Sequence, residues 1–72
     1  MRTFAESLRL ARKRRDLTVE ALARICSMSQ PNISHFESGR REPSLANLRK
    51  IAVALDVTAD YLLGLTNDTR RI

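Results

Sequence analysis

The apolar and small residues between Leu17 and Ser44 recur at spacings that fit two short helices joined by a tight turn. Such spacing turns one face of each helix inward and leaves the outer face of the second helix polar. Two short helices that cross at a steep angle need a small residue at their closest approach, and Ala23 provides it. The inward positions are Leu22, Ala23, Cys26, Met28, Ile33 and Phe36.

The outer face of the second helix carries side chains that can form hydrogen bonds with base edges or with phosphates. These residues are Ser29, Gln30, Asn32, Ser34 and His35. Of all the features of the chain, this polar face says most about function.

The length and composition set bounds on the fold. A chain of 72 residues makes one domain and buries only about 60% of its unfolded surface. Two Gly and two Pro leave little room for strands joined by tight turns, which favours an all-α class. The lone Cys26 cannot form an internal disulfide, as expected in a reducing cytoplasm. No long apolar run or secretory signal is present, so we expect a cytoplasmic protein without a membrane span.

The charge is positive and unevenly placed. The net charge is +5, with one basic group before Asp16 and a second, smaller one beyond the two-helix segment. Taken alone, the charge is explained equally well by solvated helix faces and by a polyanionic partner. The polar face of the second helix described above shifts the balance toward nucleic acid. The basic residues are Arg2, Arg9, Arg12, Lys13, Arg14 and Arg15, then Arg40, Arg41, Arg49 and Lys50.

The chain predicts five short helices in residues 1–65, followed by a polar tail at 66–72. Ser or Thr precedes each helix as the N-cap, and Thr3 with Glu6 has the form of a capping box. We expect Gly39 after the third helix to be left-handed. Ser27 occupies the turn, where a positive φ would cost a serine about 1 kcal/mol. The N-caps are Thr3, Thr18, Ser29, Ser44 and Thr58, and the inner stripe of the fourth helix is Leu45, Leu48, Ile51, Ala52 and Leu55.

Three motifs carry a family resemblance that covers residues 8–64. They are L-T-x-E-x-L-A from Leu17, N-I-S-x-F-E-S-G-R-R-x-P-S from Asn32 and D-Y-L-L-G from Asp60. Together they resemble the Xre family of phage lambda and Cro-type repressor domains. The resemblance implies a compact, lambda repressor-like five-helix bundle containing a helix-turn-helix. It also implies a homodimer that binds double-stranded DNA at a palindromic operator, with the third helix in the major groove.

The resemblance places base contacts on the third helix. Gln30 stands where the family commonly has its principal base-reading amide, which can pair with adenine N6 and N7. Asn32 is similarly placed for a base or phosphate, and Pro31 replaces a residue that is often polar, so it can meet a thymine methyl. His35 and Ser34 complete the set. For His35, a surface histidine without a DNA contact is nearly as good an interpretation, and for Ser34 the alternative is a contact with the DNA backbone alone.

Phosphate contacts are expected at both ends of the motif. Thr18 and the free N–H groups at the start of its helix make a natural phosphate site. Relatives often have glutamine at Val19, so only its backbone remains for this contact. Ser29 begins the next helix, and Arg40 and Arg41 occupy the loop where relatives hold the DNA backbone with Lys or Arg.

Two further positions are expected to be structural. In relatives, the residues equivalent to Arg12 and Glu37 form a largely buried ion pair, whose disruption costs about 3–5 kcal/mol. Cys26 reads as a small buried hydrophobe rather than a redox switch. One Cys and one His cannot form a structural zinc site, so no metal or cofactor is expected. No catalytic motif is present in the sequence, and we expect no enzyme activity.

The C-terminal segment is unusually apolar. Tyr61, Leu62, Leu63 and Leu65 are more than a six-residue segment can hide in a small core, so some should remain exposed. Relatives dimerise through this end, which points to a dimer interface at Tyr61, Leu62 and Leu65. The alternative is that Leu62 and Leu65 simply cover the bundle. Ile25 is also apolar where a surface residue is expected, and the sequence gives no reason for it.

Two functional classes remain open. The leading hypothesis is a sequence-specific transcription regulator that occupies a promoter or touches RNA polymerase from an adjacent site. The alternative is an antitoxin that holds a toxin and autoregulates its operon. The chain lacks a long disordered tail that could wrap a toxin, which weighs against the second class.

Overall fold

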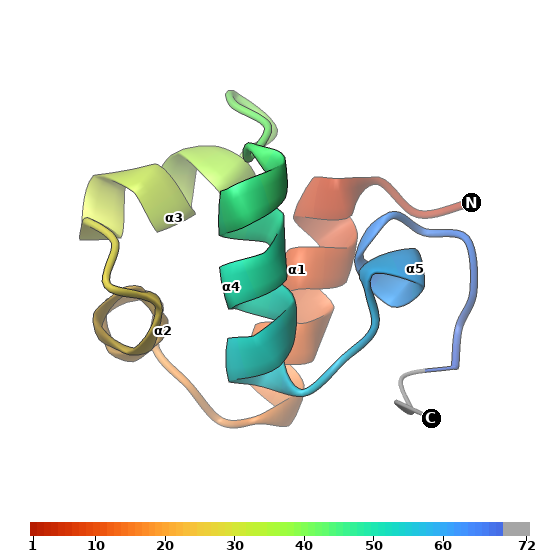
Figure 1. The fold of residues 1–72 in the computed structure, drawn as a ribbon, viewed down its shortest axis with the longest axis horizontal. Coiled ribbons are helices and arrows are strands. Elements are labelled where there is room, and N and C mark those ends of the chain that lie inside the picture. Colours follow the sequence, from red (N-terminus) through yellow and green to blue (C-terminus); the bar gives the residue numbers. More distant parts are fainter. Residues whose placement is uncertain (69–72) are drawn as a thin grey trace.

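The structure is a computed structural model that describes residues 1–68, and within them it contains five helices and no strand (Figure 1). The all-α class and the five-helix bundle are therefore confirmed. Of the expected polar tail, residues 69–72 lie outside the described residues. The helices are α1 (Phe4–Arg14), α2 (Val19–Cys26), α3 (Gln30–Glu37), α4 (Leu45–Leu55) and α5 (Ala59–Leu62).

Each helix begins at the Ser or Thr that the sequence predicts as its N-cap. In every case the cap has extended backbone, and its hydroxyl accepts a hydrogen bond from the N–H three residues on. At α1 the capping box is complete, because the Thr3 N–H also donates to Glu6 Oε1 at 2.9 Å. These bonds satisfy helix N–H groups that have no intrahelical acceptor.

Left-handed residues stop the helices and reverse the chain. Ser27 ends α2 at φ 57°, so it adopts the left-handed conformation that is costly for a serine, and Gly39 follows α3 at φ 79°, as predicted. Asp16 after α1 and Asp56 after α4 are also left-handed, which the sequence analysis did not anticipate. Aspartate tolerates this conformation better than most residues because its short polar side chain bonds locally.

The core lies where the helices meet. α3 packs against α1 and α2, α4 packs against α2, and α5 closes the bundle against α1 and α4. The prediction for Leu45 is wrong: this residue is 81% exposed, because α4 packs through its later turns, where Ile51 and Leu55 are buried. The buried hydrophobic residues are Leu8, Ala11, Leu22, Ala23, Cys26, Ile33, Phe36, Ile51, Leu55, Val57, Tyr61 and Leu62.

The N-terminal segment lies beside α5 (Figure 1). The Arg2 guanidinium carbon is 5.0 Å from the centre of the Tyr61 ring, a cation–π arrangement. The backbone of Arg2 also runs against Gly64, which is left-handed at φ 79°. The two ends of the described chain therefore support each other, and they leave α3 and the loop after it free on another side of the bundle.

Candidate nucleic-acid interface

The turn between α2 and α3 is short and internally bonded. Ser27 is left-handed, and the Met28 N–H donates to the Ala23 carbonyl at 2.9 Å, so the chain reverses without leaving α2 uncapped. Ser29 then caps α3 by accepting from the Asn32 N–H at 3.3 Å. Pro31 sits in the first turn of α3, where its missing N–H removes no intrahelical bond. This geometry fixes α3 against α2.

The two faces of α3 differ sharply. Ile33, Phe36 and Glu37 are buried against the bundle. On the opposite side Gln30, Pro31 and Ser34 are exposed, while Asn32 and His35 are half-buried. Of the five residues predicted to contact bases, three are thus fully presented to a partner and two sit at the edges of that face.

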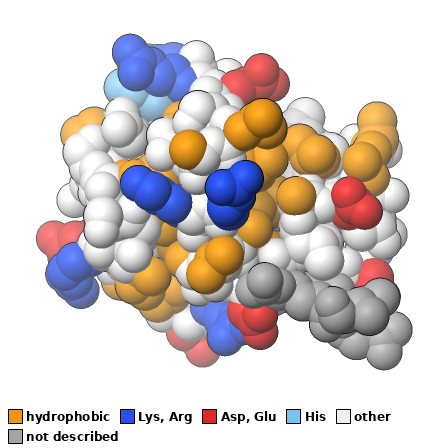
Figure 2. All heavy atoms as spheres, viewed as in Figure 1, with side chains coloured by type: hydrophobic (Ala, Val, Ile, Leu, Met, Phe, Trp, Pro, Cys, Tyr) orange, Lys and Arg blue, Asp and Glu red, His pale blue; other side chains and the backbone are white. Residues whose placement is uncertain are grey.

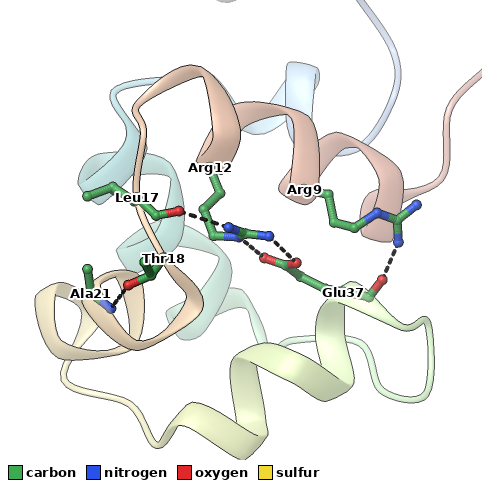
Figure 3. A network of polar contacts seen from close by, with 6 residues as sticks. All are labelled: Arg9, Arg12, Leu17, Thr18, Ala21 and Glu37. Carbon is green, nitrogen blue, oxygen red and sulfur yellow. Dashed lines mark hydrogen bonds and ion pairs between the residues drawn. The ribbon is translucent and has the colours of Figure 1, made fainter.

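A buried ion pair ties α3 to α1 (Figure 3). Arg12 Nε lies 2.5 Å from Glu37 Oε2, and Arg12 Nη2 donates to Glu37 Oε1 at 3.0 Å, which makes a bidentate pair. Arg12 Nη1 also donates to the Leu17 carbonyl at 2.8 Å. Only 13% of the Arg12 side chain and 9% of the Glu37 side chain are exposed. Because the pair is largely removed from solvent and hydrogen-bonded on both sides, Glu37 holds α3 against α1 rather than facing solvent.

Arg9 forms a second contact between α1 and α3, which was not predicted from the sequence. Its Nη1 donates to the Glu37 carbonyl at 2.5 Å, at the end of α3 (Figure 3). A basic side chain at a helix C-terminus satisfies a carbonyl that has no intrahelical donor. The feature of the sequence that could have indicated this contact is the spacing of three between Arg9 and Arg12, which places both on the same face of α1.

The loop after α3 presents two arginines to solvent. The backbone N–H groups of Arg40 and Arg41 donate to the His35 carbonyl at 3.0 and 3.3 Å, so the end of α3 holds the loop. Both side chains are exposed. In Figure 2, Lys and Arg side chains gather beside histidine over α3 and this loop. The position suits electrostatic contact with a polyanion next to the polar face of α3.

The start of α2 offers backbone donors rather than side chains. The Thr18 hydroxyl accepts from the Ala21 N–H at 3.0 Å and is used as the cap (Figure 3). The Val19 side chain packs on the core, so only its backbone N–H remains for a phosphate contact. Ser29 is exposed at the start of α3. Glu20 is exposed in the first turn of α2, and its carboxylate weakens the positive field there.

The C-terminal segment requires a correction. Tyr61 and Leu62 are 1% and 0% exposed, so they belong to the protomer's own core and are not free for a dimer contact. α5 packs on α1 and α4, and Arg2 lies on the Tyr61 ring. Leu63 and Leu65 are 46% and 62% exposed instead. The exposed apolar residues at this end are therefore Leu63 and Leu65.

Cys26 and His35 carry the remaining reactive side chains of this region. Cys26 is buried, and burial raises the pKa of its thiol above the usual 9.0, although the nearby Lys50 charge opposes this. Among the described residues, His35 Nδ1 is buried without a hydrogen-bond partner. Within residues 1–68 no group of three or more His, Cys, Asp or Glu is placed to hold a metal ion. None of the helices there is long and apolar enough to cross a membrane.

The fold and this face define a class of protein: small helix-turn-helix domains. The structure superimposes on the P22 c2 repressor, solved in complex with synthetic operator 9T, with a TM-score of 0.86 and 30% identity; the match covers 92% of this chain and 100% of that one. The restriction-modification controller protein C.AhdI from Aeromonas hydrophila matches with a TM-score of 0.78 and 34% identity, over 82% of this chain and 89% of that one.

Sequence comparison agrees. The family model described as Helix-turn-helix matches residues 8–62, so the chain belongs to the helix-turn-helix family. YqaE of Bacillus subtilis, described as an uncharacterized HTH-type transcriptional regulator, is 38% identical over 60 residues, which cover 83% of this chain and 52% of that protein. The chain spans about half of the length of the curated relatives it matches.

Proposed function

We propose that this chain is a sequence-specific, double-stranded DNA-binding transcription regulator that places α3 in the major groove. The observation that carries the proposal is the polar outer face of α3, held by the buried Arg12–Glu37 pair and followed by the exposed Arg40 and Arg41. A rigid helix with a solvated polar face reads base edges, and flanking cations hold phosphates. The P22 c2 repressor, which shares this fold and was solved in complex with a synthetic operator, supports operator DNA as the partner.

The proposed base contacts are Gln30, Pro31, Asn32, Ser34 and His35. Gln30 leads because its amide is exposed in the first turn of α3 and can both donate to and accept from adenine. The proposed phosphate contacts are the Thr18 and Val19 segment at the start of α2, Ser29, and the two loop arginines. This arrangement separates recognition by α3 from positioning by its flanks.

We further propose a homodimer on a palindromic operator. Leu63 and Leu65 support it, because exposed apolar side chains next to a packed core favour burial against a second copy. A two-fold dimer would set the two α3 helices about 34 Å apart, one turn of DNA. The protein would act by occupying a promoter or by contacting RNA polymerase from an adjacent site.

A bacterial operator lies in the cytoplasm, so we place the protein's action there and assign it no catalytic step. Nothing in the described residues favours the alternative of an antitoxin that holds a toxin. The function proposed is therefore binding alone.

The first experiment selects bound genomic fragments at about 150 mM salt with excess competitor DNA, followed by sequencing. We expect inverted repeats whose half-site centres are about 10–11 bp apart. Enrichment of single, unpaired half-sites would overturn the dimer and keep the DNA-binding function. Loss of all binding under competitor would overturn sequence-specific binding itself.

A further inference from the structure

An open groove of about 410 Å³ lies between the end of α2 and the middle of α4. Ile25, whose apolar side chain the sequence analysis could not explain, is 55% exposed on one wall, and Val53 is 59% exposed on the other. The proposed DNA interface uses neither residue. The groove is lined by Ile25, Cys26, Ser27, Arg49, Lys50, Val53 and Ala54.

Two cations stand on the α4 wall of this groove. Arg49 and Lys50 are exposed, and within residues 1–68 neither side chain forms an ion pair or hydrogen bond. Arg12 and Arg15, by contrast, each have a carboxylate partner. Figure 2 looks onto α4 and shows Lys and Arg side chains among hydrophobic ones on this surface. The groove thus combines apolar walls with unneutralised positive charge.

The apolar surface continues across α4. A second groove of about 330 Å³ shares Arg49 and Val53 with the first and extends to Leu45, which is 81% exposed. Arg49 and Val53 therefore form a ridge with a groove on each side. A ridge of this kind fits the side chains of an amphipathic helix laid across it.

We propose that this surface, the α2–α4 groove, binds an acidic amphipathic helix of a second protein. Apolar side chains of the partner would cover Ile25 and Val53, while its carboxylates would neutralise Arg49 and Lys50. Opposite charges around an apolar centre give such an interface both specificity and rapid association.

Charge and position argue against the other occupants. A second copy joined two-fold through this groove would bring its own Arg49 and Lys50 against these cations, and like charges repel. DNA would leave Ile25 and Val53 packed against charged phosphates. Ile25 also lies about 10 Å along α2 from Thr18, given a rise of 1.5 Å per residue, so both ends of α2 can be occupied together.

The test is an NMR titration of the whole chain with a synthetic peptide that has Leu at helical spacings of three and four and Glu on both flanks. We expect the amide signals of Ile25, Arg49 and Val53 to shift. The double substitution Arg49→Glu, Lys50→Glu should weaken binding by about tenfold or more. The matched control Lys13→Glu, Arg14→Glu makes the same charge change at the exposed end of α1 and should leave binding unchanged.

Two further probes make the result decisive. The same peptide with Lys in place of Glu should not bind, and a non-operator DNA duplex should not shift the groove signals. Equal binding of the acidic and basic peptides, equal weakening by the control substitutions, or DNA shifts at Ile25 and Val53 would each overturn the proposal. The spectrum of each variant without ligand shows whether it has kept the fold.

Discussion

A Cβ atom at Gly64 would overlap the backbone carbonyl oxygen of Arg2. The end of α5 and the N-terminal segment are thus in contact through their main chains, at a point where only glycine fits. The contact holds Arg2 over the Tyr61 ring and closes the bundle on the side of α1 and α5.

Gly64→Ala should therefore destabilise the protein more than Gly39→Ala. Both glycines have φ 79°, so each alanine meets a left-handed backbone penalty of about 1–2 kcal/mol. Gly39 has nothing within 4 Å of its Cβ position, whereas Gly64 would add a clash that costs about 1–3 kcal/mol more. Urea denaturation of the two variants measures the difference, and equal losses would show that the Arg2 contact does not constrain Gly64.

Arg12→Met or Glu37→Gln should each cost about 3–5 kcal/mol, because either change leaves the other member of a buried ion pair without its partner. The control is Arg15→Met, which breaks an exposed pair at 3.2 Å and should cost about 0–1 kcal/mol. The double variant Arg12→Met, Glu37→Gln should lose less than the sum of the two single changes. Additive losses in denaturant titrations would refute the coupling.

Ser27→Gly should stabilise the protein by about 1 kcal/mol, because it removes the Cβ from a left-handed residue. Ser34→Gly makes the same chemical change in the right-handed interior of α3, where it should destabilise by about 0.5–1 kcal/mol. Thermal denaturation of the two variants gives the sign. A loss of stability at Ser27 would mean that its hydroxyl contributes more than the backbone strain costs.

The stability of the α1 cap should depend on pH. Hydrogen bonds from the Thr3 backbone N–H and then the Thr3 hydroxyl, with Arg9 and Arg2 nearby, lower the pKa of Glu6 below its usual 4.5. Because the folded-state pKa is the lower one, the stabilisation is present above pH 4.5 and is lost as pH falls through the folded value.

Glu6→Gln should remove this acid dependence, since the amide can still accept the bond but does not titrate. Denaturation midpoints taken from about pH 7 down to about pH 2 should converge for the two proteins at the acid end. A constant difference between them across this range would contradict the assignment.

On an operator, Gln30→Ala and Arg40→Ala should have different effects. Gln30→Ala should reduce discrimination at one base position by about 1–3 kcal/mol. Arg40→Ala should weaken binding to all sequences alike and reduce the salt slope by about 1. Binding isotherms at several salt concentrations, on operator and single-base variants, separate the two. A uniform loss from Gln30→Ala would remove it from base recognition.

The sequence predicts local structure better than it predicts which residues are covered. All five N-caps and the left-handed Gly39 follow from local rules, and the structure confirms them. The burial of Tyr61 could not be foreseen, because Arg2, which lies far away in sequence, covers its ring. Leu45 fits the helical period of α4, yet period alone does not say where neighbouring helices stop.

The same limit applies to the candidate site. The exposed face of α3 follows from its spacing, whereas the link from Arg9 to the Glu37 carbonyl depends on how α1 and α3 approach. Ser7 is fully buried because it lies three residues after Phe4 and four before Ala11 on the inner face of α1, and its hydroxyl has no partner among the described residues.

The two faces of α3 have an evolutionary consequence. Gln30, Pro31 and Ser34 make no part of the core, while Ile33 and Phe36 on the same helix do. Exposed positions of this kind usually change stability by no more than about 0.5 kcal/mol when substituted. New target sequences are therefore accessible to this scaffold in single steps, each nearly neutral for folding, and its regulatory repertoire can diverge faster than its architecture.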